Sequence, residues 1–465
     1  MSDPNLPPKL DESSQGNPRD NWFVRLPSWG KWTIGIVAAL LLMGIGAAIG
    51  GGNNKEGDLK DEVATLEGQV VKAETSAKEA EAAAKKAEGA EREEVKAGEE
   101  KARKLYTAVQ ALDNTDFSRT KSNAERKKEK LKQIRSAEDV WSNKGGSSDE
   151  IALLYVSLAR AVGLSAYAAQ VANRDRVIFD PGYMTADQLD DYIVILNLDG
   201  KDLILDPGQK MCPFGQLHWK HTDTAGLRMT LGSPSLFSLH KPPDATVSAS
   251  VQRSASLVIV ADGSVDGNID VTMTGAEALY WRQIALQNDL DEVKKQFSES
   301  LRDYLPEGIH TDFDQFVGLD ETGSALVAKL KVSGTLGSPT GKYLLLPEQL
   351  FNPAKHPFVT EAKRITPIDM HYPRTEHDSA TYTLPDGYTV GNIPQPAKAS
   401  WPNHATFTIE SAAGQKTVTV KRTLDRNFTL ASPSEYSSLH DFYQKVAIAD
   451  QAQLVLLRPP SEKAN

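Results

Sequence analysis

The sequence predicts an α+β protein in which helical segments precede a mixed core and a β-rich domain. Three observations support this prediction. An uncharged apolar run lies near the amino terminus, residues 56–105 are rich in Ala, Glu and Lys without any proline, and strand-like patterns dominate after residue 240. Apolar residues recur every three to four positions in helices and every two in strands, so the patterns distinguish these elements. A chain of 465 residues has room for two or three domains.

Charge and cysteine content exclude several classes of function. The chain has 52 Lys and Arg against 62 Asp and Glu, which gives a formal net charge of −10. Because nucleic-acid binding needs a basic surface, we expect no nucleic-acid partner. Cys212 is the single cysteine, so an intrachain disulfide is excluded and a cysteine-based zinc site is disfavoured. We expect no cofactor.

The amino-terminal region predicts a membrane anchor. Residues 1–21 are polar and rich in Pro, Asp, Asn and Ser, and residues 1–31 are predicted to form a disordered tail. Residues 32–52 are uncharged and apolar, and a run of this length is close to what crosses a bilayer. Trp22 and Trp29 suit the interface before it. A cleaved signal peptide is the alternative, but its first region would be unusually long, so we favour a transmembrane helix.

The charges that flank this run predict its orientation. Arg19, Arg25 and Lys31 precede the run, whereas Lys55 and Lys60 follow it among acidic residues. Because Lys and Arg concentrate on the cytoplasmic side, the slight bias predicts a cytoplasmic amino terminus. The body of this single-pass membrane protein would then be extracytoplasmic, and periplasmic in a Gram-negative bacterium.

Residues 53–105 predict a long helical stalk. Leu, Val and Ala recur with a seven-residue period, which is typical of a coiled coil. The first seam positions are Leu59, Leu66, Ala73, Ala80 and Ala87. One interpretation is a weak homo-oligomer that pairs through residues 56–105. The other is a single solvated helix, stabilised by Glu–Lys pairs along its surface.

Residues 106–240 predict a compact α+β domain. Ser147 or Ser148 can cap a helix, and the apolar residues that follow recur at helical spacing until Gly163. Strand-like runs then occupy residues 166–171, 192–198 and 202–205. The Asp199-Gly200 dipeptide between the last two runs is typical of a tight hairpin.

The start of this helix and the hairpin resemble the core of transglutaminase-like (papain-like) domains. Gly146-Ser147-Ser148 resembles the family's Gly-x-Cys helix start, with Ser148 at the cysteine position. Asp191 stands where the family's His opens the first strand, and Asp206-Pro207 matches the Asp-Pro that closes the second. The resemblance is to the bacterial type that carries a DUF3857 β-domain, although here the anchor and stalk take that domain's usual amino-terminal place.

This resemblance implies that the catalytic residues have been lost. The family's thiolate is activated by His, which the Asp orients. With Ser148 and Asp191, a serine hydroxyl would face a carboxylate of pKa near 4, which is a poor base. Ser148, Asp191 and Asp206 are therefore predicted to be vestigial, in a non-catalytic module that binds an unknown protein or peptide partner, or acts as a scaffold, at the cell envelope. The alternative is an amidase, peptidase or acyltransferase that uses Ser148, or Cys212 with His218.

Two histidines follow the Asp-Pro. His218 and His221 could place two imidazoles together, with Cys212 upstream. They are weak metal candidates, because a closed zinc site needs four ligands and no further ones are evident. We therefore expect no metal.

Residues 241–465 predict a β-rich, sandwich-like domain with helical inserts. Strand patterns flank a turn at Asp262-Gly263, and further ones follow towards the carboxyl terminus. The expected strands are 249–260, 264–273, 325–332, 380–384, 405–409 and 417–424, and the expected helices are 276–290, 291–304 and 433–446.

Overall fold

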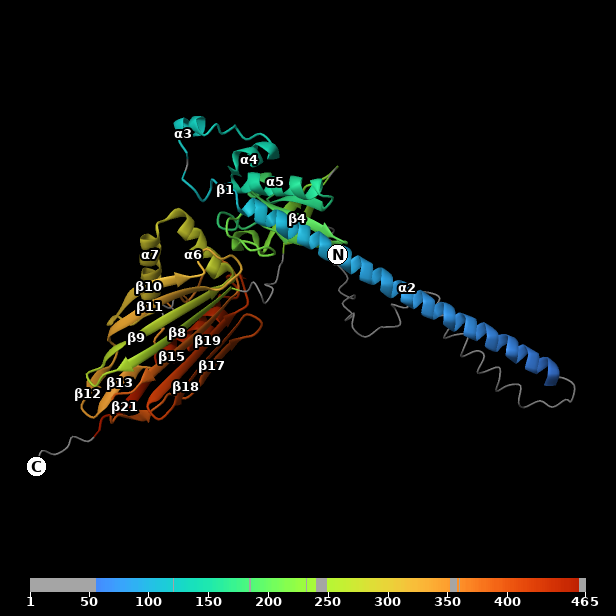
Figure 1. Cartoon of the computed structure of the whole chain (residues 1–465). Helices are drawn as coiled ribbons and strands as arrows, with labels where there is room; N and C mark the ends of the chain where they lie inside the picture. Colours follow the sequence, from blue (N-terminus) through green and yellow to red (C-terminus); the bar gives the residue numbers. More distant parts are fainter. Residues whose placement is uncertain are drawn as a thin grey trace, which may run out of the picture. The chain divides into compact units, whose positions relative to one another are not determined.

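The computed structural model divides the chain into two compact units, Met1–Lys96 and Ala97–Asn465 (Figure 1). It describes residues 56–119, 121–183, 185–230, 232–239, 249–351, 358 and 360–459. The predicted tail and anchor, residues 1–31 and 32–52, lie outside this set, so both stay predictions. Among the described residues, no helix combines the length and apolar character that a membrane crossing requires.

One helix, α2, runs from Glu56 to Gln110, so it contains the predicted stalk from residue 56 onwards and continues beyond residue 105, whereas residues 53–55 lie outside the described set. Ion pairs between residues four apart line its surface, for example Lys85 with Glu81 at 2.8 Å. Such pairs are typical of a solvated helix. Whether α2 also pairs with a second chain stays a prediction.

The first domain of the second unit is a mixed α+β core, which confirms the predicted fold class at this level. Helix α5 (Ser148–Ala161) packs on β3 (Ser165–Val171) and β4 (Asp191–Leu198) of an antiparallel five-stranded sheet. The sheet order is β5-β4-β3-β6-β7, with β5 Lys201–Leu205, β6 Thr224–Arg228 and β7 Ser235–Leu239. Asp199 and Gly200 both have positive φ, as the predicted two-residue hairpin requires.

The end of α2 belongs to this core and helps to position its loops. Ala102 and Tyr106 are buried beside Tyr155 of α5, whose hydroxyl donates to the Ala102 carbonyl at 3.1 Å. The Tyr106 hydroxyl lies 3.0 Å from the carbonyl oxygen of Asp206 and 2.9 Å from that of Cys212. One buried tyrosine of α2 therefore holds both ends of the segment that follows β5.

The β-rich domain is built on one eight-stranded sheet of order β10-β11-β9-β8-β15-β19-β18-β17 (Figure 1). Strands β8 and β15 are parallel, and all other neighbours are antiparallel. The strands are β8 Ala249–Ile259, β9 Ser264–Thr274, β10 Ile309–Val317, β11 Leu326–Thr335, β15 Arg374–Thr383, β17 Ala397–Trp401, β18 Ala405–Ala413 and β19 Thr417–Arg426.

A small sheet of order β12-β13-β21-β16 accompanies the large one. Its strands are β12 Ser338–Thr340, β13 Tyr343–Pro347, β16 Thr389–Asn392 and β21 Gln453–Leu457. In the described part of this domain there are three helices, α6 Gly275–Gln287, α7 Leu290–Arg302 and α8 Tyr436–Asp450.

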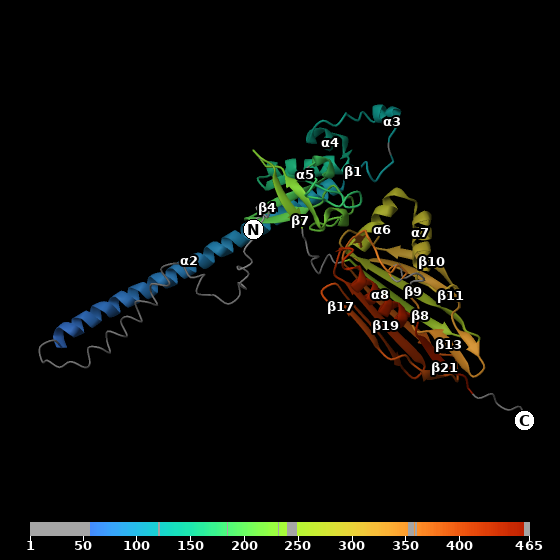
Figure 2. The same cartoon turned by 180° about the vertical axis from the view of Figure 1, so that it is seen from behind.

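Only one face of the large sheet is buried. Every second residue of β8 is buried and the alternate residues are half-buried or exposed, as a sheet with one solvated face requires. Side chains of α6, α7, α8 and the small sheet join the sheet in a single apolar core, and Figure 2 shows α8 on the side seen from behind. The domain thus differs from the predicted sandwich, because helices and a small sheet take the place of a second large sheet.

The buried face also contains charged residues. Arg253 of β8 pairs with Asp378 of β15, Nε to Oδ1 at 2.6 Å, and Arg422 of β19 pairs with Asp378 at 3.1 Å and with Asp450 at 2.9 Å. All four side chains are at most 3% exposed. Charges at such depth are tolerated because each has an opposite partner.

Candidate functional site

The predicted nucleophile position lies at the first turn of α5. Ser147 is the N-cap residue: its hydroxyl accepts from the Glu150 amide at 3.2 Å, and the Glu150 carboxylate accepts from the Ser147 amide at 2.8 Å. This is a capping box. Of the two predicted caps, Ser147 takes the role, and Ser148 is the first residue of the helix.

The hydroxyl of Ser148 faces an amide rather than a base. Asn114 Nδ2 donates to Ser148 Oγ at 3.3 Å and to the Gly208 carbonyl at 2.7 Å. Among the described residues, no hydrogen bond joins this hydroxyl to an imidazole or a carboxylate. A general base must be within hydrogen-bond reach of the proton it removes, so Ser148 is not activated in this arrangement.

The loop after β5 approaches the helix start closely. A Cβ on Gly208 would lie 2.3 Å from the Ser148 carbonyl oxygen, which no side chain tolerates. Glycine at this position therefore allows the segment that carries Asp206 to pack against α5.

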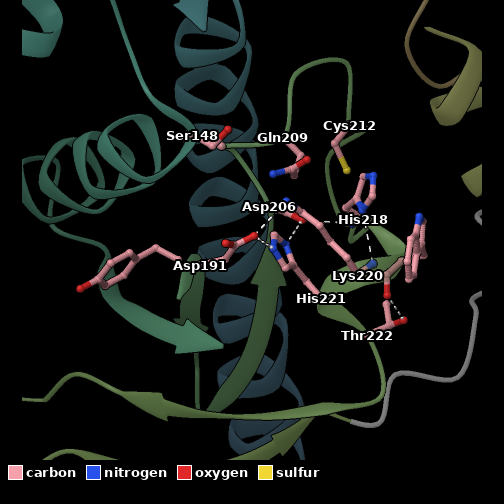
Figure 3. Close-up of polar contacts among 12 residues, drawn as sticks. Ser148, Asp191, Asp206, Gln209, Cys212, His218, Lys220, His221 and Thr222 are labelled. Carbon is pink, nitrogen blue, oxygen red and sulfur yellow. Dashed lines mark hydrogen bonds and ion pairs between the residues drawn. The ribbon is translucent and has the colours of Figure 1, made fainter. Parts of the chain in front are cut away.

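Asp191, His221 and Asp206 form one hydrogen-bonded cluster, the Asp–His–Asp cluster (Figure 3). His221 Nε2 lies 2.8 Å from Asp191 Oδ2, and His221 Nδ1 lies 2.7 Å from Asp206 Oδ2. Asp191 opens β4, Asp206 follows β5, and His221 ends a 3-10 turn at Trp219–His221. The sheet therefore brings two of the predicted vestigial residues together, and the imidazole lies between them.

Burial makes these contacts strong. The side chains of His221 and Asp206 are 1% and 0% exposed, and that of Asp191 is 16% exposed. Burial opposes protonation of His221, but the charge of Asp206 and the hydrogen bonds to both carboxylates outweigh it and raise the pKa of His221 to about 8. At neutral pH the imidazole is therefore cationic and donates to both neighbours.

Asp191 is held in its charged form. Burial alone would raise the pKa of the Asp191 carboxyl, but hydrogen bonds from His221 and Lys220 hold it well below its usual range. Lys220 Nζ lies 2.8 Å from Asp191 Oδ2, and Asn173 Nδ2 donates to the same oxygen at 3.1 Å. With three donors, Asp191 is a structural anion and a poor proton acceptor.

Cys212 and His218, the alternative catalytic residues, do not form an activated thiol–imidazole pair. The thiol is buried and donates to the Gln216 carbonyl at 3.4 Å. His218 Nδ1 accepts from the Lys220 amide at 3.3 Å, and the imidazole also hydrogen-bonds the Gln283 side chain. Burial and the neighbouring charge of His221 lower the pKa of His218 to about 3. A histidine that binds protons this weakly is a poor base for a thiol.

The weak metal candidates do not form a ligand set. The ring centroids of His218 and His221 are 6.3 Å apart, and both nitrogens of His221 already face carboxylates. In the described ranges, no group of three or more His, Cys, Asp or Glu side chains is arranged to hold a metal ion.

Sequence reasoning missed the role of His221. It treated this histidine only as a metal candidate and treated Asp191 as a vestigial residue. The available signal was an acidic residue at the family's histidine position together with a histidine shortly after Asp206-Pro207. That combination is compatible with a displaced imidazole between the two carboxylates, but the position of the imidazole comes from the structure.

A cavity of about 600 Å³ lies beside this region. Trp219 and His218 line it from the α+β core, and Tyr280, Trp281 and Arg374 are among the residues that line it from the β-rich domain. The Arg374 guanidinium is paired with Glu277 at 2.9 Å, another lining residue. Aromatic faces with a few fixed charges are typical of ligand pockets.

Comparison with known proteins identifies one segment of the β-rich domain. Residues 342–456 match the family described as a "Domain of Unknown Function with solved-structure structure (DUF3858)". This segment begins at β13 and contains β15, β19, α8 and most of β21. No curated protein matches the chain.

One solved structure is described as a "putative protease" from Parabacteroides distasonis. Its identity to this chain is 13% and its TM-score is 0.37, over 77% of this chain and 58% of that one. A similarity of this degree supports no conclusion about fold or activity.

Proposed function

We propose that residues 106–240 form a transglutaminase-like core that has lost its catalytic function, and that the chain acts as a binding or scaffolding module. The observation that supports this proposal is the Asp–His–Asp cluster. Asp191 and Asp206 occupy two catalytic positions of the resemblance, and they hold the imidazole of His221 by both ring nitrogens. An imidazole in this state has no free nitrogen with which to activate a nucleophile.

The nucleophile position supports the same proposal. Ser148 Oγ accepts from Asn114, and Gly208 packs against the Ser148 backbone. The nearby carboxylate of Asp116 accepts from the Ser148 backbone amide at 2.9 Å and makes no hydrogen bond with the hydroxyl, so the hydroxyl is not activated. In this proposal the helix start and the Asp-Pro loop keep the backbone arrangement of the family. The side chains at the catalytic positions make internal hydrogen bonds and have no catalytic role.

The proposed location is the cell envelope. The apolar run of residues 32–52 would anchor the chain with its amino terminus in the cytoplasm, and α2 would separate the body from the membrane. The expected partner is a protein or peptide. The cavity lined by Trp219, Tyr280 and Trp281 is our candidate for the contact site, because aromatic side chains supply large contact areas at little entropic cost.

Labelling of the native full-length chain with active-site probes tests the proposal. A fluorophosphonate reports an activated serine, and iodoacetamide reports an accessible thiolate. We expect neither Ser148 nor Cys212 to react in the folded protein, whereas Cys212 should react after unfolding in guanidinium.

Stoichiometric labelling of the folded chain that Ser148→Ala abolishes would contradict the proposal. It would favour the alternative, an amidase, peptidase or acyltransferase with a site around Ser148. Labelling of Cys212 by iodoacetamide in the folded chain, abolished by Cys212→Ala, would favour a site formed by Cys212 and His218.

A further inference from the structure

A second cavity lies wholly within the β-rich domain and has a volume of about 540 Å³. The loop after α7, the segment before β12, strand β13 and the start of β21 supply its walls. The apolar part of the lining is aliphatic, from Leu305, Pro306, Leu336, Leu345, Leu346, Pro347 and Ala452. None of the Asp–His–Asp cluster contributes to it, so the inference below is independent of the function proposed above.

Gln349 is among the residues that line this cavity, and it is 0% exposed. Neither Nε2 nor Oε1 of its amide has a hydrogen-bond partner within the described part of the chain. The neighbouring Glu348 is satisfied, since its carboxylate accepts from Ser411 Oγ at 2.6 Å and its amide donates to the Ala452 carbonyl at 2.9 Å. An unpaired buried amide is costly, and native proteins rarely keep both its donor and its acceptor unused.

We propose that this cavity binds a neutral peptide amide that carries an aliphatic side chain, with Gln349 as the recognition residue. A primary amide both donates and accepts, so Gln349 can pair with the C=O and the N–H of one peptide group. The aliphatic walls complement an aliphatic side chain on the same ligand.

The charges of the lining favour a neutral ligand over an anion. Glu307 and Asp450 are the charged residues of the described lining, and it contains no lysine or arginine. A carboxylate in this cavity would meet these acidic side chains, and the described lining offers it no cation. No aromatic residue is among the described residues of this lining, which disfavours a sugar as the source of the amide, because sugars commonly stack on aromatic faces.

Ligand-observed NMR titration of the full-length chain tests the proposal with three probes. N-acetyl-L-leucinamide has the amide and the aliphatic side chain, N-acetyl-L-leucine replaces the terminal amide by a carboxylate, and N-acetylglucosamine presents an amide on a sugar. We expect saturable binding of the leucinamide in the millimolar range, with at least tenfold weaker binding of the other two. This comparison needs no variant, so it holds even if a substitution prevents folding.

Two variants then locate the binding site. Gln349→Leu keeps the volume of the side chain and removes both polar atoms, so leucinamide binding should be lost while the midpoint of thermal unfolding stays equal or rises. Gln444→Leu makes the same chemical change on the exposed side of α8, and it should bind like the wild type. The proposal would be overturned if the leucinamide does not bind, or if it binds no more tightly than the carboxylate or the sugar. It would also be overturned if Gln349→Leu binds the leucinamide as the wild type does.

Discussion

His221 Nδ1 lies 2.7 Å from Asp206 Oδ2, and both side chains are almost completely inaccessible to water. The same Asp206 oxygen accepts from the His218 amide at 3.0 Å, whereas Asp206 Oδ1 has no partner among the described residues. Among the described residues, His221 is therefore the only cationic side chain at hydrogen-bond distance from this carboxylate. Loss of His221 would leave the buried charge of Asp206 unpaired.

Replacement of His221 should destabilise the core strongly. His221→Phe leaves the charge of Asp206 buried and unpaired, a change that typically costs about 3–5 kcal/mol. Urea denaturation at pH 7 measures the free energy of unfolding. His377→Phe is the control, because His377 is exposed on β15, and it should leave that free energy nearly unchanged. Equal stability of the two variants would show that the Asp206 contact contributes little.

The same pair predicts a loss of stability at alkaline pH. The pKa of His221 is raised from 6.5 to about 8 in the folded chain, so its contribution is complete below pH 6.5 and disappears as the pH rises through 8. A shift of this size corresponds to about 2 kcal/mol. Denaturation at pH 6.5 and pH 9 measures it. Asp206→Asn removes the charge that raises this pKa, and it should flatten the profile in this range; an equally steep profile would refute the assignment.

Adjacent serines at the start of α5 should respond differently to the same substitution. Ser147→Ala removes the capping side chain and should lower the free energy of unfolding by about 1 kcal/mol. Ser148→Ala removes only a hydroxyl that accepts from Asn114, and it should cost less than about 0.5 kcal/mol. If Ser148→Ala proves the more costly change, the hydroxyl has a role beyond this contact.

The close contact between Gly208 and α5 predicts intolerance of any side chain. Gly208→Ala places a methyl group 2.3 Å from the Ser148 carbonyl oxygen, so either the loop or the helix start must move. Overpacking of this kind typically costs about 1–3 kcal/mol. Thermal and urea unfolding measure the loss. A variant as stable as the wild type would mean that the Asp206 segment can shift freely.

The buried charges of the β-rich domain predict a large effect of a single arginine. Arg253→Met leaves Asp378 with Arg422 as its remaining cationic partner, and the free energy of unfolding should fall by about 3–5 kcal/mol. Arg119→Met is the control, because that exposed arginine pairs with Glu125 at the surface. Comparable losses of unfolding free energy in both variants would show that burial does not make the ion pair of Arg253 more important for stability than a surface pair.

Much of the local structure was predictable because it depends on short-range patterns. The helix from residue 148, the hairpin at Asp199-Gly200 and the pair of strands around Gly263 all occur where the sequence predicts them. In each, the apolar spacing and the turn residues act within a few positions. No distant contact is needed to specify these elements.

The start of β15 shows why other elements were missed. The sequence predicts a strand only from residue 380, whereas β15 begins at Arg374. Its first half contains Glu376 and Asp378, and charged residues are not expected on a buried face. They are accommodated because Arg253 of another strand neutralises them, a contact between residues more than a hundred positions apart. The link between His221 and Asp191 spans only 30 positions, but it too depends on how the sheet brings separate segments together.

The parallel pairing of β8 with β15 affects the order in which the large sheet can form during synthesis. Arg253 of β8 lies opposite Asp378 of β15 in the register, so the centre of the large sheet joins two strands separated by a long stretch of chain. During synthesis, β8, β9 and β11 can pair early, but the edge of β8 has no neighbour until the ribosome has released β15. Until then Arg253 lacks Asp378 as its partner and the edge of β8 is unpaired, and such an edge can pair with another chain.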